Sequence, residues 1–265
     1  MNYLNLIKKE LKSLNFQTLI DDYNNSKNPD IFPFNGTQIY CGRQGSGKTA
    51  SAVHHVRKLK ASYPKAIIVS NLEFTQLEAL TFGSLEELKT VLRHIDTTKQ
   101  YIRFHDMDEL ALALVNVNND VYGVIFLIDE IHTYLNALDS KNIPMFIFTE
   151  ISQQRKQHKC IIGTSQLFLR VAKPMREQCD NIIMCNTILG VFTIQRAYKA
   201  DEIDQDYDGK LSGTLRRRGM FVQTRELRNS YDTYQKVVSS SEQFENIQKP
   251  TILQPQKHRL LSSKH

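Results

Sequence analysis

Residues 40–51 read YCGRQGSGKTAS, a stretch in which the pattern Gly-x-x-x-x-Gly-Lys-Thr runs from Gly42 to Thr49. The β-rich run at residues 37–41 indicates a strand, and the residues from Thr49 to Lys60 indicate a helix. Where a glycine-rich loop joins a strand to a helix, backbone N–H groups and the helix N-terminus can surround phosphate groups. The stretch therefore predicts a phosphate-binding loop (P-loop) in an α/β domain.

The P-loop pattern also assigns roles to single residues. Lys48 is expected to reach the β- and γ-phosphates of a nucleoside triphosphate, and the Thr49 hydroxyl is expected to ligate Mg²⁺. ATP and Mg²⁺ are therefore the expected cofactors. The expected nucleotide contacts are Gly42, Arg43, Gln44, Gly45, Ser46, Gly47, Lys48, Thr49 and Ala50.

A second stretch, VIFLIDEIH at residues 124–132, supplies acidic groups for hydrolysis. Its first part is apolar enough for a buried parallel strand, and Asp129 and Glu130 follow at the end of that strand. Asp129 is expected to hold Mg²⁺ together with Thr49, and Glu130 to polarise the attacking water as a general base. A strand ending in solvated acids is the alternative, disfavoured by the P-loop upstream. The acidic pair favours an ATPase over a small-molecule kinase.

A third polar strand end follows at residues 159–166, which read KCIIGTSQ. Gln166 is expected to contact the γ-phosphate or water, with Thr164 as the alternative sensor. Arg155 lies near the end of a helix expected over residues 144–157. From there it could reach into a neighbouring subunit and stabilise charge on the transferring phosphoryl group. A solvated basic helix end is the alternative interpretation of Arg155.

The overall pattern is that of one α/β domain with two appendages. Strand-like and helix-like runs alternate over residues 32–238, which predicts a mostly parallel central sheet flanked by helices, as in RecA-like (ASCE) P-loop NTPases. Residues 1–31 carry one apolar stripe and predict an N-terminal helical segment. Residues 239–265 are polar, contain two prolines and predict a mobile C-terminal tail.

The composition limits the class of partner and the compartment. The chain has 265 residues, a net charge of +6 and a pI of about 9.0, which is compatible with an anionic polymer as partner. Its four cysteines show no Cys-x-x-Cys spacing, which disfavours zinc and disulfides and indicates a reducing cytoplasm. The longest strongly apolar run, residues 124–128, is too short to span a bilayer, which takes about 20 helical residues.

The motifs together resemble those of one group of ATPases. GRQGSGKT, LIDEIH and QQRKQHKCIIGTSQ, followed by RVAKPMREQ, are similar to the FtsK–HerA superfamily of ring-forming, ATP-driven DNA pumps. RNSYDTYQKV at residues 228–237 and the short chain look most like viral packaging ATPases and phage assembly proteins of the zonular occludens toxin (Zot) type. The resemblance covers about residues 37–237. It implies ATP hydrolysis in a hexameric or pentameric ring, with Arg155 acting on the neighbour's nucleotide.

Two features depart from the pattern of that group. The Zot-type assembly proteins usually carry a membrane-spanning segment, and the sequence contains no candidate for one. This favours a packaging motor in the host cytoplasm or bound to the virion. The residues before Gln166 read Gly-Thr-Ser, whereas the group usually has Thr directly before Gln. The sensor role therefore falls on either Gln166 or Thr164.

Two clusters of cations are candidates for contact with the DNA backbone, which a pump must grip without reading bases. The first cluster is Arg216, Arg217 and Arg218, and the second is Arg170, Lys173 and Arg176. The second cluster lies in a helix expected over residues 167–178. A solvated surface is the alternative for each cluster, and Arg176 could instead act at a subunit interface.

Three functional hypotheses follow from these patterns. The leading one is an ATP-hydrolysing DNA translocase that packages or pumps a viral or mobile-element genome as a homo-oligomeric ring, with double-stranded DNA and a capsid or portal component as partners. The second is a Zot-like ATPase of phage morphogenesis or extrusion, which predicts no stimulation of hydrolysis by DNA. The third is a nucleotide-dependent switch or small-molecule kinase, which predicts activity as a monomer.

Overall fold

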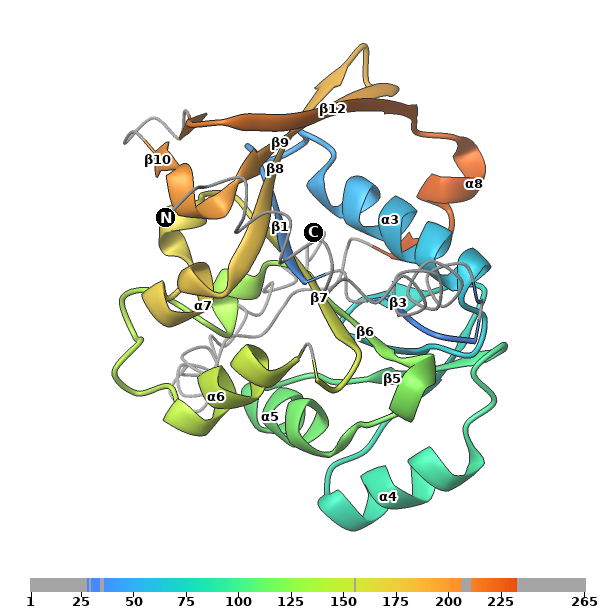
Figure 1. The fold of residues 1–265 in the computed structure, drawn as a ribbon. Helices are drawn as coiled ribbons and strands as arrows, with labels where there is room; N and C mark the ends of the chain where they lie inside the picture. The colour runs from blue at the N-terminus through green and yellow to red at the C-terminus, as the bar shows by residue number, and fades with distance from the viewer. Residues whose placement is uncertain (1–27, 29, 34–35, 155, 206–210, 233–265) are drawn as a thin grey trace, which may run out of the picture.

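The computed structural model describes residues 28, 30–33, 36–154, 156–205 and 211–232 (Figure 1). The strands within them are β1 (Thr37–Cys41), β2 (Ile67–Ser70), β3 (Glu73–Phe74), β4 (Glu78–Leu80), β5 (Gln100–Arg103), β6 (Val124–Ile128), β7 (Lys159–Ser165), β8 (Cys179–Ile188), β9 (Phe192–Lys199), β10 (Asp204–Gln205), β11 (Leu211–Ser212), β12 (Leu215–Val222) and β13 (Tyr231–Asp232). The α-helices are α3 (Lys48–Ser62), α4 (Leu85–His94), α5 (Met107–Asn116), α6 (Met145–Gln153), α7 (Lys173–Glu177) and α8 (Arg225–Arg228). Most of the expected N-terminal helical segment, the whole C-terminal tail and Arg155 lie outside the described residues.

One nine-stranded sheet organises the described chain, with the strand order β12-β9-β8-β1-β7-β6-β2-β5-β4. The strands from β8 to β4 in that order pair in parallel, and helices connect several of them. At the other end, β9 pairs antiparallel with both β8 and β12. The expected α/β fold with a mostly parallel sheet is therefore confirmed.

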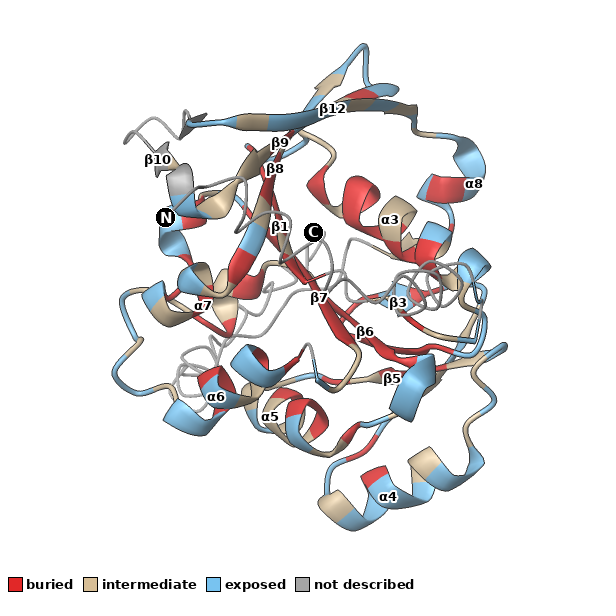
Figure 2. Cartoon of the chain, viewed as in Figure 1, coloured by how far each residue is buried: buried red, intermediate tan, exposed pale blue. Residues whose placement is uncertain are grey.

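Alternating side chains of the central strands build a core on each face of the sheet. On β6, for example, Phe126 belongs to one apolar cluster, whereas Ile125 and Leu127 belong to the other. Helices α5, α6 and α7 contribute to the first cluster, and α3 and α8 to the second (Figure 1). Figure 2 shows the central strands buried along their length and the helices buried on one side only. This two-layer burial explains why β6 reads as a continuous apolar run.

The parallel arrangement brings four chain segments to one edge of the sheet. The P-loop follows β1, Asn71 follows β2, Asp129 follows β6 and Gln166 follows β7. These four strands are neighbours in the order β1-β7-β6-β2. Ligands of open α/β sheets bind outside the carboxyl ends of the strands, so this edge is the place to look for a site.

The single helix expected over residues 167–178 is wrong. A 3₁₀ turn covers Phe168–Arg170, and α7 starts only at Lys173. Between them, Val171 forms an isolated bridge with Asn136, and the Ala172 N–H donates to the carbonyl of Leu135 at 2.8 Å. These bonds to a distant segment use the backbone groups that a continuous helix would need.

Residues 192–199 form β9, and the sequence did not indicate β12. Strands β8, β9 and β12 form a three-stranded antiparallel ribbon at one edge of the sheet. The ribbon lies beside α3 and the P-loop (Figure 1). Arg216, Arg217 and Arg218 lie on β12, its outermost strand. Each helix that the structure describes is too short or too polar to cross a lipid bilayer.

Candidate functional site

The P-loop follows β1 and leads into α3, as its sequence predicts. Gly42, Gly45 and Gly47 all have positive φ angles. At Gly42, which has φ of +148°, a Cβ would lie 2.8 Å from the carbonyl oxygen of Cys185. Only glycine lets the chain turn this close to β8. The loop can therefore wrap its N–H groups around a small anion.

A polar atom of the loop supports the expected fit to phosphate. The hydroxyl oxygen of Ser46 is buried and makes no hydrogen bond within the described residues. Buried polar atoms without a partner are rare in folded proteins and often mark a place for a ligand or an ion. The side chain of Lys48, 6% exposed, lies at the start of α3, directly after the loop.

Asp129 is the centre of the hydrogen-bond network opposite the P-loop. Its Oδ1 accepts from Thr49 Oγ1 at 2.9 Å and from Thr164 Oγ1 at 2.7 Å. Asn71 holds its backbone from both sides, since Asp129 N–H donates to Asn71 Oδ1 at 2.8 Å and Asn71 Nδ2 donates to the Asp129 carbonyl at 3.0 Å. The structure thus brings together Thr49 and Asp129, the two expected oxygen ligands of Mg²⁺.

The environment of Asp129 suits a divalent cation. Burial raises the pKa of this carboxyl group, and the hydrogen bonds from Thr164 and Thr49 oppose the rise. A bound Mg²⁺ would also favour the ionised form. Mg²⁺ usually takes one or two carboxylate or hydroxyl ligands together with substrate phosphates. One hydroxyl and one carboxylate beside a P-loop match that donor set.

Glu130 has an unusual backbone conformation next to Asp129. Its φ and ψ are +47° and +51°, the left-handed region that non-glycine residues seldom occupy. Its N–H donates to Thr164 Oγ1 at 2.8 Å, which fixes this conformation. Its carboxylate lies 3.7 Å from Lys48 Nζ and 3.3 Å from Nδ1 of His132. Glu130 is therefore aimed at the residue expected to bind the γ-phosphate.

His132 is a neutral neighbour of that carboxylate. Burial lowers the pKa of His132, and the positive charges of Arg170 and Lys48 lower it further. Its Nδ1 also lies 3.3 Å from the hydroxyl oxygen of Ser165. A neutral imidazole can accept or donate a hydrogen bond here, so it can orient Glu130 or Ser165 but adds no charge.

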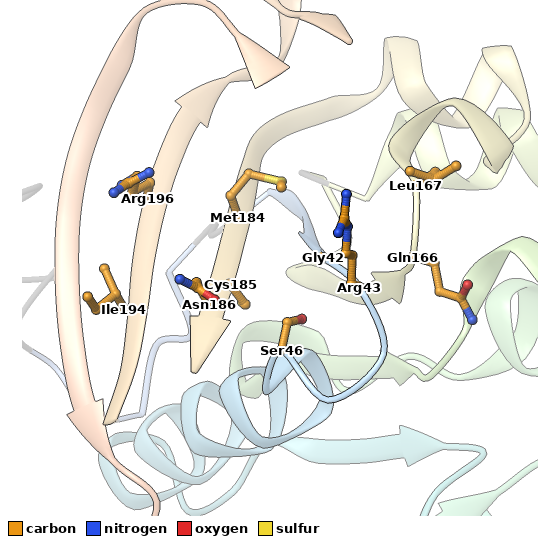
Figure 3. Close-up of a pocket in the computed structure, with 10 residues that line it drawn as sticks. All are labelled: Gly42, Arg43, Ser46, Gln166, Leu167, Met184, Cys185, Asn186, Ile194 and Arg196. Atoms are coloured by element: carbon orange, nitrogen blue, oxygen red, sulfur yellow. The ribbon is translucent and has the colours of Figure 1, made fainter. Parts of the chain in front are cut away.

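A pocket of about 490 Å³ opens beside the P-loop on the side of the ribbon. Its lining, drawn in Figure 3, is Gly42, Arg43, Ser46, Gln166, Leu167, Met184, Cys185, Asn186, Ile194 and Arg196. The walls combine apolar side chains with a few polar ones, the usual composition of a small-molecule site. The pocket extends from β9 and β8 past the P-loop to Gln166 and Leu167, which follow β7, and Asp129 follows the next strand, β6.

The structure places the two sensor candidates differently. Thr164 is fully buried and contacts both Asp129 and Glu130. Gln166 is exposed in the loop after β7 and lines the pocket near Arg43. Thr164, the alternative in the sequence interpretation, is thus the residue that bonds to the acidic pair.

The two clusters of cations lie in separate places. Arg170 and Lys173 are exposed after β7, and Lys173 pairs with Glu177 at 3.7 Å. Arg176 is half-buried, with its guanidinium over the ring of Phe168. The three arginines of β12 are exposed, and the first of them, Arg216, donates to the side-chain oxygen of an asparagine on β8 at 3.0 Å. Of the two clusters, the one on β12 therefore occupies consecutive residues of one strand, whose side chains alternate between its two faces.

Comparison with known proteins identifies the family. The family described as zonular occludens toxin (Zot) matches residues 36–237. The chain belongs to the Zot family. As a Zot-family member with this site, it is a P-loop NTPase, related in type to the viral packaging ATPases that its motifs resemble. No curated protein matches the chain.

Solved structures similar to this Zot-family chain include two viral packaging proteins and one toxin domain. The genome packaging NTPase B204 from Sulfolobus turreted icosahedral virus 2, in complex with ATP-gammaS, is 15% identical, with a TM-score of 0.46 over 70% of this chain and 96% of that chain. The N-terminal domain of zonular occludens toxin from Neisseria meningitidis is 16% identical, with a TM-score of 0.43 over 74% and 98%. The DNA-packaging ATPase B204 from Sulfolobus turreted icosahedral virus is 16% identical, with a TM-score of 0.44 over 69% and 97%.

Two residues of the candidate site, Asn71 and His132, were not predicted from the sequence. Asn71 directly follows the apolar strand residues 67–70, so it shares the signal that identified Asp129, a polar residue at the end of a buried strand. His132 stands two residues after Glu130, but only the 3₁₀ turn at Ile131–Thr133 brings its ring back to the carboxylate.

Proposed function

We propose that this protein hydrolyses ATP and uses the energy to move double-stranded DNA, as a homo-oligomeric ring that packages or pumps a viral or mobile-element genome. The observation that carries the proposal is the hydrolytic geometry around Asp129. Thr49 and Thr164 bond to its carboxylate, and Glu130 lies 3.7 Å from Lys48. A small-molecule kinase seldom places a glutamate there, because activating water would waste ATP.

Each residue has one part in the proposed reaction. Thr49 and Asp129 would hold Mg²⁺, which when bound would neutralise charge on the β- and γ-phosphates. Lys48 would leave Glu130 and pair with the phosphates, because a phosphate carries more charge than a carboxylate. Glu130, released from Lys48, would then accept a hydrogen bond from the attacking water and orient it. The resting ion pair between Lys48 and Glu130 would thus keep the base occupied until a nucleotide binds.

The pocket beside the P-loop is the proposed place for the adenosine part of ATP. Met184 and Ile194 offer apolar surface to a base, and Asn186 offers hydrogen-bonding groups. A volume of about 490 Å³ is within the range of about 300–1,000 Å³ that is common for small-molecule sites. The nucleotide would then extend from this pocket across the P-loop toward Asp129.

The arginine strand β12 is the proposed contact for DNA. Arg216, Arg217 and Arg218 are adjacent and exposed on an edge strand, where they can meet phosphates without reading bases. Edge strands also carry charges to prevent strand pairing with other chains, so this row of charge alone is compatible with both roles. The net charge of +6 favours a polyanion as partner.

Apolar side chains that are exposed on the ribbon, among the residues that the structure describes, support self-association. Ile188, Phe192, Met220 and Val222 are exposed where β8 ends, β9 begins and β12 ends. A second copy of the chain could cover this surface and place Arg155 at the nucleotide. The other proposed partners are a capsid or portal component, and the proposed location is the host cytoplasm or the virion.

Membership of the Zot family favours a second candidate function. The chain could be a phage morphogenesis or extrusion ATPase that drives virion assembly without pumping DNA. The match over residues 36–237 supports this candidate. The two candidates share the nucleotide site and differ in whether DNA is the moved substrate.

The test is the ATPase rate of the full chain with and without double-stranded DNA. The translocase proposal expects stimulation by DNA, loss of at least about 100-fold in kcat for Glu130→Gln, and retained ATP binding by that variant. Replacing Arg216, Arg217 and Arg218 with Gln should lower DNA affinity and reduce the slope of log affinity against log salt by about 2 to 3. The matched control replaces Lys89, Arg93 and Lys99 with Gln, three exposed cations remote from β12.

Two outcomes decide between the candidates. If DNA leaves the rate unchanged and the triple variants behave alike, the DNA-pumping role is wrong and the assembly candidate gains.

Subunit mixing tests the ring. Arg155→Ala and Lys48→Ala are each expected to be inactive, and a mixture of the two should regain activity if Arg155 acts on a neighbour. A mixture without activity would contradict action between subunits.

A further inference from the structure

Three polar side chains of the ribbon hold the P-loop from the side opposite Asp129. Thr187 Oγ1, on β8, donates to the carbonyl oxygen of Ser46 at 2.9 Å. Thr193 Oγ1, on β9, lies 3.0 Å from Thr187 Oγ1. Gln223, directly after β12, donates from Nε2 to Thr193 Oγ1 at 2.7 Å and to Thr187 Oγ1 at 3.2 Å. We call Thr187, Thr193 and Gln223 the polar latch.

The latch packs directly against Gly47, the last glycine of the P-loop. Gly47 has φ of +82° and precedes the first residue of α3. A Cβ at Gly47 would lie 2.5 Å from Thr187 Oγ1 and 2.7 Å from Gln223 Nε2. Thr193 is fully buried, and the Gln223 N–H donates to the carbonyl of Val191 at 2.8 Å. The latch is therefore a fixed contact rather than a surface encounter.

The bond to Ser46 sets the direction of a whole peptide group. Among the described residues every peptide bond is trans. A trans peptide is planar, so its C=O and N–H point in opposite directions. Because Thr187 holds the Ser46 carbonyl toward the ribbon, the Gly47 N–H must point away from the ribbon.

We propose that the polar latch positions the Ser46–Gly47 peptide for phosphate binding. It presents the Gly47 N–H to the phosphates and keeps the Ser46 carbonyl oxygen away from them. A flipped peptide would remove one donor and turn a partly negative oxygen toward an anion. Thr187, Thr193 and Gln223 are thus positioning residues that act through the backbone of the P-loop. This inference rests on the proposed binding of ATP by that loop.

The latch also connects the P-loop to the arginine strand. Gln223 follows Val222, the last residue of β12, and Val222 pairs with Phe192 of β9. The strand carrying Arg216–Arg218 therefore ends at a side chain that reaches the nucleotide loop. Among the described residues, the ribbon bonds to the Ser46 carbonyl through this latch.

The experiment compares Thr187→Val with Thr187→Ser in the full chain. Valine keeps the shape of threonine and removes the hydroxyl, whereas serine keeps the hydroxyl. The control is Thr75→Val, which removes another hydroxyl-to-carbonyl bond, the one from Thr75 Oγ1 to the Asn229 carbonyl. The measurements are the Kd of a fluorescent ATP analogue, kcat and KM for ATP, and the urea midpoint of each variant.

The proposal expects Thr187→Val to raise Kd and KM by about 10- to 100-fold, the value of one hydrogen bond to a charged group. At saturating ATP, kcat should change by less than about threefold. Thr187→Ser should restore Kd to within about threefold, and Thr75→Val should leave it unchanged. An unchanged Kd in Thr187→Val, or a serine variant as weak as the valine variant, overturns the proposal.

A second variant and a second readout keep the test decisive. Gln223→Met removes the amide donors from a half-buried position and should raise Kd in the same direction, by a smaller factor. Hydrogen exchange of the peptide covering residues 42–50, without nucleotide, should be faster in Thr187→Val. Equal exchange rates in wild type and Thr187→Val would overturn the proposal, and this readout does not depend on nucleotide binding. Absence of DNA stimulation would contradict the translocase role and leave these results unaffected.

Discussion

Thr164→Val is expected to remove two hydrogen bonds at the acidic pair while keeping the volume of the side chain. The hydroxyl of Thr164 donates to Asp129 Oδ1 at 2.7 Å and accepts the Glu130 N–H at 2.8 Å. The residue is fully buried, so water cannot replace either bond. Valine has nearly the same volume, which means that a cavity contributes little to the result.

The expected loss of stability comes from two bonds. A hydrogen bond to a charged group contributes about 1.5–3 kcal/mol, and a buried N–H left without a partner costs about 1–3 kcal/mol. The left-handed conformation of Glu130 costs a further ~1 kcal/mol, which the bond from its N–H now offsets. When that bond is lost, Glu130 can relax, so part of the cost is recovered. The free energy of unfolding should therefore fall by about 3 kcal/mol.

The functional effect follows from the same relaxation. If Glu130 leaves the left-handed region, its carboxylate moves away from the position 3.7 Å from Lys48. The kcat for ATP should fall by about 100-fold, the contribution of one positioned general base, while KM changes little.

The assay is urea unfolding together with steady-state ATPase kinetics of wild type, Thr164→Val and Thr164→Ser. Serine keeps both hydrogen bonds and loses one methyl group, so it should cost only about 1 kcal/mol and retain most of the activity. A valine variant within about 0.5 kcal/mol of wild type, with kcat within about threefold, would refute the reasoning. The same holds for a serine variant as damaged as the valine variant, since the hydroxyl would then not matter.

Two further predictions concern the fold. Burial lowers the pKa of Lys159 to about 8, so between pH 8 and 10.5 the unfolded chain binds more protons than the folded chain at this residue. The free energy of unfolding of the wild type therefore gains up to about 1.4 kcal/mol per pH unit from Lys159 in this range. Lys159→Met should remove this contribution. Urea unfolding of both proteins across that range measures it, and parallel curves would contradict it. Gly123→Ala should lower the free energy of unfolding by about 2–4 kcal/mol, because φ is +76° and a Cβ would lie 2.4 Å from Phe32. The control Gly190→Ala, with φ of +67° and open space around it, should cost about 1 kcal/mol, and equal losses would show that the contact with Phe32 is unimportant.

The parts of the fold that the sequence predicted are those set by local pattern. The P-loop needs only eight consecutive residues, and the strand before Asp129 is apolar at every position because both faces of β6 are covered. Ser84, which precedes α4 and stands three residues before Glu87, is an equally local feature. Its Oγ accepts from the Glu87 N–H at 3.3 Å, and Glu87 in turn accepts from the Gly83 N–H at 2.7 Å.

The parts that the sequence did not predict depend on partners far along the chain. The sequence of β12 shows only a run of arginines. Its pairing with β9 makes these residues a strand. Residues 167–178 have a helix-like pattern, but backbone bonds to residues 135–136 interrupt it. Asn71 and Thr187 reach their partners across 58 and 141 residues, a distance at which sequence periodicity carries no information.

Sheet register decides which of the two sensor candidates, Thr164 or Gln166, can bond to the acidic pair. β7 lies between β1 and β6, so one side chain at its end can face both the P-loop strand and the acidic strand. Gly163 pairs with Ile128, which places the next residue, Thr164, level with Asp129. Gln166 shares the face of Thr164 but lies two residues beyond it, about 6.6 Å further along the strand direction and outside the sheet. The side chain of Ser165, one residue further, points to the opposite face of the sheet. On β7, Thr164 is therefore the residue that can bond to the acidic pair.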